Sequence, residues 1–488
     1  MPTILGANSV SGFNISNSVR FNQGDHCLTQ NFSGTESSNR KKWTFSVWFK
    51  RSNLIGSAAL FTAGSSGQDE MTIRLEAHKI DWQEYKVSNS TMIGQLITNQ
   101  VLRDVSAWYH LVCRWDSTDS TAGDRMKMFL NGVEITSFAT DNNPTEDYDS
   151  MASNSVLHNV GRQSWNNQGD FDGYMAEINF AEGVSLDPSY FGETNDNGVW
   201  VPKKPDVSSY GNNGFFLEFQ QTGTSQNSSG IGADTSGNDK HFAVSNLAAT
   251  DVTTDTPTNN FATLRPHGFP QDSRSVLSEG NTDFDFTGDG NLGGRVLSAH
   301  AISNIGVTTG KWYAEFKLTE DADGGFVGVS NMSNKIQTAN ISSYNYLYTD
   351  NGNKYVREHT GEDESNAAHG AAVSVNDIVQ VALDATNRNV YFGKGGSWAS
   401  GSGAWDQSGP TSAVAYTADF VTTDSHDVVV FNVASAGSSE APRWQANFGN
   451  PPFAISSGNA DGAGHGNFEY AVPSGYFALN TKNLAKYG

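Results

Sequence analysis

The sequence is poor in cysteine, in charged residues and in long apolar runs. Only two cysteines, Cys27 and Cys113, occur in 488 residues, which excludes a disulfide framework. We expect two buried free thiols, and a single bridge between them is the alternative. No stretch reaches the roughly 18 apolar residues of a membrane-spanning helix, so no membrane insertion is expected. The first residues, MPTILGANSVSG, lack the features of a signal peptide, which predicts a soluble protein made in a reducing cytoplasm.

Basic residues are scarce relative to acidic ones. The chain has 30 Lys and Arg against 52 Asp and Glu, which gives a formal net charge of −22. Such a charge repels a phosphate backbone and an anionic membrane surface, so nucleic acid is not an expected partner. Charged residues make up only 17% of the chain, and aromatic residues make up 11%. Because aromatic side chains supply core area, this composition argues against a disordered protein.

Glycine and short alternating segments are abundant. The chain has 50 glycines, and amphipathic helical patterns are scarce. Short aromatic-rich runs are separated by Gly, Asn, Asp and Ser, which is typical of antiparallel strands joined by turns. Asn131-Gly132 lies between two apolar runs and predicts a type I′ hairpin. In residues 43–50, alternate apolar side chains share one face of the predicted strand: Trp43, Phe45, Val47 and Phe49. The pattern therefore predicts an all-β chain.

The same pattern divides the chain into two β units joined by a turn-rich segment. Residues 203–283 include stretches such as TGTSQNSSGIGADTSGNDK with almost no large apolar side chains, and we expect this range to be a linker. The run FFLEF at 215–219 predicts a strand of the first unit or a strand that bridges the units. We expect domains at residues 1–202 and 284–488. Each is predicted to be an antiparallel β-sandwich.

Several segments of the first half share their order and spacing with one known family. These are VRFNQGDHCL at 19–28, WTFSVWFKR at 43–51, WYHLVCRWD at 108–116, MFLNGVEI at 128–135 and FDGYMAEINFAEG at 171–183. Together they resemble the laminin-G/concanavalin A-like jelly-roll family, and the resemblance covers about residues 1–200.

The second half resembles a SPRY domain, which is also a bent β-sandwich. The segments that carry this resemblance are GKWYAEFKL at 310–318, GGFVGVSN, the hairpin DIVQVALDATNRNVYFGKGGSW at 377–398 and the closing RWQANFGNPPF at 443–453. The resemblance covers roughly residues 285–488. Together the two resemblances imply a jelly-roll, concanavalin A-like sandwich followed by a SPRY-like sandwich.

The pairing of these two domains resembles proteins encoded by marine bacteriophages. The resemblance implies a virion protein that is made in the host cytoplasm and located on the particle. A tail fibre or adhesin that binds the surface polysaccharide of the host is the expected role. A structural head-decoration or tail component that binds other virion proteins is the alternative. Virion proteins of this kind form closed symmetric oligomers, so we expect a homo-oligomer, and specifically a trimer.

Catalytic motifs are missing from the sequence. Retaining glycosidases need two carboxyl groups about 5 Å apart, and concanavalin A-like folds include such enzymes. Glu177 and Glu182 are five residues apart and would fall on opposite faces of a regular strand, while Glu218 stands alone. No zinc-binding or nucleophile-elbow motif occurs either. We therefore expect no enzymatic activity, and a glycoside hydrolase is the disfavoured reading.

Calcium is the one ion whose ligands the sequence offers. Calcium takes six to eight oxygen ligands, several of them carboxylates. The run DNNPTEDYDS contains four candidate carboxylates: Asp141, Glu146, Asp147 and Asp149. A second run at 283–291 offers Asp283, Asp285 and Asp289. We expect calcium at the first run, and a solvated acidic loop is the alternative.

Tryptophans in predicted loops are the candidate sugar-binding residues. Sugars are held by aromatic faces together with Asn, Asp and backbone groups. Trp165, Asn166 and Asn167 are consecutive in a predicted loop of the first unit, and Trp398 and Trp405 fall in the Gly/Ser-rich segment SWASGSGAW of the second. A loop holds an exposed tryptophan without a core behind it, which favours a binding role. The alternative is that each tryptophan folds back onto its sandwich.

Overall fold

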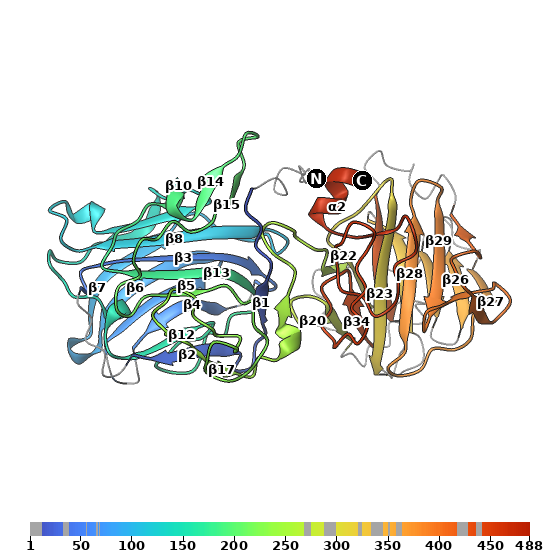
Figure 1. Ribbon diagram of the computed structural model, residues 1–488, viewed down its shortest axis with the longest axis horizontal. Helices are drawn as coiled ribbons and strands as arrows, with labels where there is room; N and C mark the ends of the chain where they lie inside the picture. Colours follow the sequence, from blue (N-terminus) through green and yellow to red (C-terminus); the bar gives the residue numbers. More distant parts are fainter. Residues whose placement is uncertain are drawn as a thin grey trace. The chain divides into compact units, whose positions relative to one another are not determined.

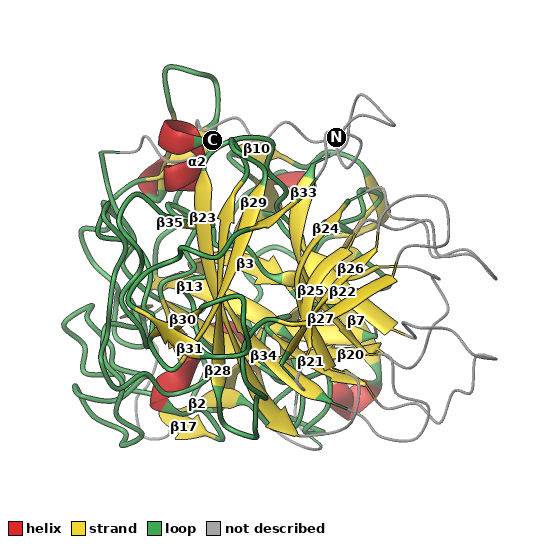
Figure 2. Ribbon diagram, turned by 90° about the vertical axis from the view of Figure 1, so that its right-hand side faces the viewer, coloured by secondary structure: helices red, strands yellow, loops and turns green. Residues whose placement is uncertain are grey.

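Strands dominate the computed structural model (Figure 2). It describes residues 12–32, 39–54, 56–64, 67, 69–267, 275–286, 299–320, 325–332, 345–349, 352–357, 364–416, 428–435 and 442–488. This architecture confirms the all-β prediction. Among the described residues, no helix is long and apolar enough to cross a membrane. The chain divides into two compact units, with the boundary between Asn260 and Phe261.

The N-terminal unit (residues 7–260) contains two eight-stranded antiparallel sheets. Sheet A has the order β10 (Val133–Glu134), β9 (Met126–Leu130), β8 (Trp108–Asp116), β3 (Lys42–Arg51), β13 (Gly173–Glu182), β1 (Ser18–Phe21) and β18 (Val252–Thr253), with β16 (Phe215–Leu217) also paired to β13. Sheet B has the order β11 (Phe138–Asn142), β7 (Thr91–Thr98), β6 (Lys79–Lys86), β5 (Glu70–Glu76), β4 (Ser57–Ala63), β12 (Leu157–Val160), β2 (Cys27–Asn31) and β17 (Ala243–Ser245) (Figure 1). A short hairpin, sheet C, consists of β14 (Gly192–Thr194) and β15 (Trp200–Pro202).

Sheets A and B enclose the core of this unit. The alternating residues of β3 point into it as predicted, and Trp43, Phe45, Val47 and Phe49 are all fully buried. At its centre Trp43 stacks on Trp115, with ring centroids 6.0 Å apart, and meets Trp82 of sheet B edge-on. Large aromatic rings of this kind contribute much of a core's buried area. Cys27 and Cys113 are free and buried, which confirms the expected thiols.

The β9–β10 hairpin confirms the turn predicted at Asn131-Gly132. Leu130 pairs with Val133, and the two turn residues have φ values of 49° and 78°. Positive φ at both central positions is the mark of a type I′ turn.

The segment expected to be a linker is divided between the two units. β16, β17 and β18 join the sheets of the N-terminal unit, and β16 places FFLEF beside β13. Widely spaced apolar side chains in this segment reach the core, namely Phe215, Leu217, Ile231 and Phe242. FFLEF thus forms a strand of the first unit, one of the two predicted outcomes, whereas Ile231 and Phe242 reach the core from turn-rich stretches without a strand-like sequence pattern. From Phe261 onward the chain belongs to the C-terminal unit.

The C-terminal unit (residues 261–488) also contains two sheets. Sheet D has the order β19 (Leu264–His267), β22 (Ala299–Ser303), β33 (Val429–Ser435), β24 (Gly325–Asn331), β25 (Asn345–Thr349), β26 (Asn353–Arg357) and β27 (Glu364–Ala368). Sheet E has the order β20 (Ser275–Ser278), β21 (Asp283–Phe286), β34 (Arg443–Asn447), β23 (Lys311–Glu320), β28 (Ile378–Asp384), β29 (Asn389–Lys394), β30 (Ser397–Ala399) and β31 (Trp405–Gln407). β32 (Val414–Ala415) pairs with β29 and β35 (Phe477–Ala478) with β23, before the terminal helix α2 (Thr481–Tyr487).

Candidate functional site

The loop of residues 161–170 is held against β4 by several hydrogen bonds. Ser164 N donates to Thr62 Oγ1 at 3.1 Å, and Thr62 Oγ1 donates to the carbonyl of Arg162 at 3.0 Å. Further along, Ala59 N donates to the carbonyl of Gly169 at 2.8 Å. Thr62 lies between two core residues of β4, so the loop contacts the face of sheet B that is opposite the core. The loop is therefore fixed to the sheet from both of its ends.

This loop displays the three sugar-binding candidates of the first unit. Trp165 is half-buried, and Asn166 and Asn167 are exposed. Asn166 Oδ1 accepts from the Gln168 amide at 3.1 Å, and the carbonyl of Asn167, which has a φ of 55°, accepts from the Arg162 guanidinium at 2.7 Å. The guanidinium itself forms an ion pair with Asp25 at 2.6 Å. A turn held by these bonds thus carries a half-buried tryptophan and two exposed asparagines in succession, residue types that suit a polar ligand with an apolar face.

The two tryptophans of the second unit lie on strands, which corrects the expectation of an open loop. The Gly/Ser-rich segment forms a tight hairpin between β30 and β31. Trp398 is only 3% exposed and packs with Tyr313 and Phe468, so its ring offers no face to a ligand. Trp405 is half-buried, and its Nε1 donates to the carbonyl of Ala371 at 2.9 Å. Trp398 therefore belongs to the interior of the C-terminal unit, whereas Trp405 stays partly exposed beside its hairpin and its binding role stays a prediction.

The acidic run of residues 141–150 does not bring its carboxylates together. Glu146 pairs with Arg125 at 3.4 Å, and Asp147 pairs with Lys41 at 3.0 Å. Asp141 accepts from Asn143 at 2.9 Å, and Asp149 is exposed. Within the described part of the chain, no three His, Cys, Asp or Glu side chains are grouped so as to hold a metal ion. The four predicted calcium ligands thus do not form a metal-binding cluster.

The second acidic run is used for packing where it is described. Asp283 is fully buried in β21 and accepts from Arg443 Nε and Gln445 Nε2, both at 2.8 Å. Burial raises the pKa of Asp285. Asp289 lies outside the described residues. Asp283 therefore stabilises the pairing of β21 with β34.

The fold brings together a carboxylate pair that sequence reasoning missed. β16 pairs antiparallel with β13, with Ile178 opposite Leu217, so Glu177 and Glu218 are neighbours across the two strands. The register of β13 shifts at this point, and Glu177 has a φ of 50°, as in a β-bulge. Burial, and secondarily the charge of Glu218, raise the pKa of Glu177 to about 8. No local signal could have found this pair, because it depends on a pairing between distant strands.

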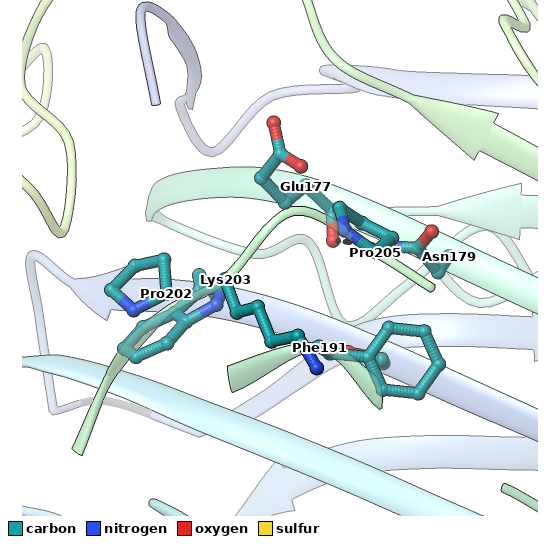
Figure 3. A pocket seen from close by; sticks show the side chains of 8 residues that line it. Glu177, Asn179, Phe191, Pro202, Lys203 and Pro205 are labelled. Carbon is teal, nitrogen blue, oxygen red and sulfur yellow. Dashed lines mark hydrogen bonds between the residues drawn. The ribbon is translucent and has the colours of Figure 1, made fainter. Parts of the chain in front are cut away.

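Glu177 lines a narrow pocket on the outer face of sheet A. The pocket has no room for a water molecule, and eight residues line it: Ser46, Trp48, Glu177, Asn179, Phe191, Pro202, Lys203 and Pro205. In Figure 3 the carboxyl group of Glu177 points away from Lys203. Lys203 donates instead to the carbonyl of Ser189 at 3.2 Å. The pocket as it stands is closed to a sugar ring.

Comparison with known families identifies the N-terminal unit. Residues 21–185 match the model of a family described as the concanavalin A-like lectin/glucanases superfamily. These residues form a laminin G/concanavalin A-like domain. The match includes the loop of residues 161–170 and ends before β14. No curated protein matches the chain.

Three solved structures show distant likenesses to parts of this chain. The SPRY domain of human HERC1 is 18% identical and covers 35% of this chain and 91% of its own, with a TM-score of 0.25. Domain 4 of AbnA, an arabinanase of Geobacillus stearothermophilus, is 17% identical and covers 37% of this chain and 81% of its own, with a TM-score of 0.27. A protein from Bacteroides ovatus that has been proposed to bind carbohydrate is 12% identical and covers 50% of this chain and 60% of its own, with a TM-score of 0.32. These TM-scores are too low to define a shared fold.

Proposed function

We propose that this chain is a non-enzymatic glycan-binding protein of a bacteriophage particle, with the role of a tail fibre or adhesin. The observation that carries the proposal is the ordered loop of residues 161–170, which lies inside the lectin-like domain and displays Trp165, Asn166 and Asn167. The ligand is a surface polysaccharide of the host. The indole ring of Trp165 would contact the apolar face of a sugar, and the two asparagine amides would bond to its hydroxyl groups.

The fixed conformation of the loop of residues 161–170 favours tight binding of the glycan. Its backbone is held by hydrogen bonds and by the Arg162–Asp25 ion pair before any ligand binds. Less conformational freedom is then lost on binding, and a larger share of the contact energy becomes affinity. An oligomer can bind several repeats of the same glycan at once. Its overall affinity then exceeds that of a single site, which suits sugar sites that are weak individually. The proposed state on the particle is a trimer in contact with other virion proteins.

The absence of catalysis is supported by the surroundings of the carboxylate pair. Glu177 is 6% exposed and lines a pocket too narrow for water. A glycosidase must place both carboxyl groups beside the scissile bond of its substrate. The closed pocket does not allow this approach. The resemblance of the domain pairing to marine phage proteins supports the placement on a particle.

A glycan array with the full-length chain tests the proposed function. We expect binding to bacterial surface polysaccharide, and we expect Trp165→Ala to weaken it at least about tenfold, which corresponds to about 1.4 kcal/mol of lost ring contact. Asn197→Ala is the matched control, because Asn197 is an exposed asparagine in the β14–β15 turn and lies outside the loop. Binding that is equal in the wild-type chain and in Trp165→Ala would contradict the assignment of this loop.

A further inference from the structure

Lys50, at the end of β3, is buried on the outer face of sheet A. Its side chain is 1% exposed and forms an ion pair with Asp255, which is fully buried. Its Nζ also donates to Asn260 Oδ1 at 2.9 Å. Asp255 and Asn260 belong to the segment that closes the N-terminal unit. An amine and a carboxyl group that are both buried are therefore in contact with each other, and the amine also contacts the partly buried carboxamide of Asn260.

Aromatic rings and fixed hydrogen bonds surround this group of three. Lys50 Nζ lies 4.7 Å from the ring centroid of Tyr174 and 5.9 Å from that of Trp108. Trp108 Nε1 donates to Asp255 Oδ1 at 3.2 Å. Asn260 Nδ2 donates to the carbonyl of Ser106 at 2.8 Å, which turns the carboxamide oxygen toward the amine. The reactive atoms are thus oriented before any reaction takes place.

The environment makes the amine of Lys50 easier to deprotonate than it is in water. Burial lowers the pKa of Lys50, and the attraction of Asp255 opposes this only in part. A buried lysine with a lowered pKa is a nucleophile, because its lone pair is free when the proton is absent. Asp255 contacts Nζ directly and is placed to accept that proton.

We propose that Lys50 and Asn260 form an intramolecular isopeptide bond, with Asp255 as the proton carrier. Lys50 Nζ attacks Asn260 Cγ, and a new Nζ–Cγ amide bond forms as the Cγ–Nδ2 bond breaks. The amine proton passes to Asp255 and from there to the departing nitrogen, which leaves as one molecule of ammonia. One amide replaces another, so no oxidant, reductant or cofactor is required.

A buried ion pair alone is a weak explanation for this arrangement. Desolvation of two charges offsets much of their attraction, and a simple pair does not require a carboxamide on the same nitrogen. A covalent bond would remove the buried charge and would link β3 to the closing segment. It would close a loop from residue 50 to residue 260, and a cross-link that closes a long loop restricts the unfolded chain strongly.

Mass spectrometry of the purified, denatured full-length chain tests the bond. We expect an intact mass lower than the sequence mass by one ammonia. Trypsin should then leave residues 43–51 joined to residues 241–274, since Lys50 is no longer a cleavage site and Arg265 precedes a proline. Fragment spectra should place the link at Lys50 and Asn260. The full sequence mass, or a loss of ammonia located at another asparagine, would overturn the proposal.

Two variants test whether Asn260, and not the adjacent Asn259, is the residue that Lys50 attacks. Asn260→Ala should restore a mass without the loss of ammonia, and Asn259→Ser should keep the cross-link. A loss of one water with a link from Lys50 to Asp255 would make Asp255 the acceptor and would also overturn the assignment. The wild-type measurement needs no variant, so the test holds even if Asn260→Ala fails to fold.

Discussion

At the scale of single residues, Glu177 combines an unusual backbone conformation with an unfavourable environment. Its φ of 50° is rare for a residue other than glycine, asparagine or aspartate. Its Oε2 atom is buried without a hydrogen-bond partner among the described residues. Asn179, its neighbour on the outer face, accepts instead from the Tyr210 hydroxyl at 2.6 Å. Such residues persist only where the surrounding structure enforces them.

Glu177 makes the stability of the N-terminal unit depend on pH. Its pKa is about 8 in the folded chain, against an ordinary value of 4.5, so the folded state binds more protons between these two values. Stability is therefore highest at the acidic end of this window and falls as the pH rises to about 8. In Glu177→Gln this contribution is absent. We expect the free energy of unfolding to fall less steeply in the variant between pH 5 and 8, by up to about 1.4 kcal/mol per pH unit.

Chemical denaturation at several pH values measures this difference. Glu193→Gln is the control, because Glu193 is exposed on β14 and the same replacement there removes no buried carboxyl group. Parallel pH profiles of the wild-type chain and Glu177→Gln would contradict the burial of an uncompensated carboxyl group.

At the scale of elements, the hairpin of sheet C covers the outer face of sheet A through Trp200. Trp200 Nε1 donates to His110 Nδ1 at 3.0 Å, and the two rings are stacked. Burial lowers the pKa of His110 to about 3, so its ring is neutral. Because Nδ1 accepts from Trp200, Nε2 carries the proton and donates to Ser46 Oγ at 2.9 Å. The indole therefore fixes a histidine tautomer as well as covering the sheet.

Gly132 allows this contact. A Cβ atom added there would lie 2.3 Å from the Trp200 ring, and the φ of 78° is also strained for other residues. Gly198 in the sheet C turn has a similar φ of 76° but open space around it. We expect Gly198→Ala to lower the free energy of unfolding by about 1 kcal/mol, because alanine is strained at this positive φ even where there is space for its side chain. Gly132→Ala should lower it by about 3 kcal/mol, because the clash displaces Trp200. Equal losses in urea unfolding would show that the hairpin can move at little cost.

Local elements could be predicted from the sequence, whereas pairings between distant segments could not. The Asn131-Gly132 turn and the inward face of β3 follow from adjacent residues, so they were predicted correctly. Glu177 and Glu218 meet only because β16 joins β13. Trp398 was expected in a loop because Gly and Ser surround it, but those residues form a hairpin that turns the ring inward. Trp165, Asn166 and Asn167 lie in one turn because they are consecutive, and their role in binding stays a prediction.

At the scale of the whole molecule, the N-terminal unit ends where the chain reaches Asn260. Its closing segment supplies β16, β17 and β18 and also the side chains that contact Lys50. The family match ends at residue 185, so these strands complete a sandwich that the matched region does not close by itself. The boundary therefore follows the core and not the change in composition that begins at residue 203.

Two fragments distinguish these boundaries. A fragment of residues 7–260 should fold with a single cooperative transition, because it contains the whole core cluster of this unit. A fragment of residues 7–202 lacks Phe215, Leu217, Ile231 and Phe242, whose burial contributes on the order of 8 kcal/mol. A loss of that size is comparable with the roughly 5–15 kcal/mol net stability of a domain, so the shorter fragment should not fold. Near-ultraviolet circular dichroism and thermal melting measure the difference. A cooperative transition in the shorter fragment would place the boundary at residue 202, because the first sandwich would then be complete without its closing strands.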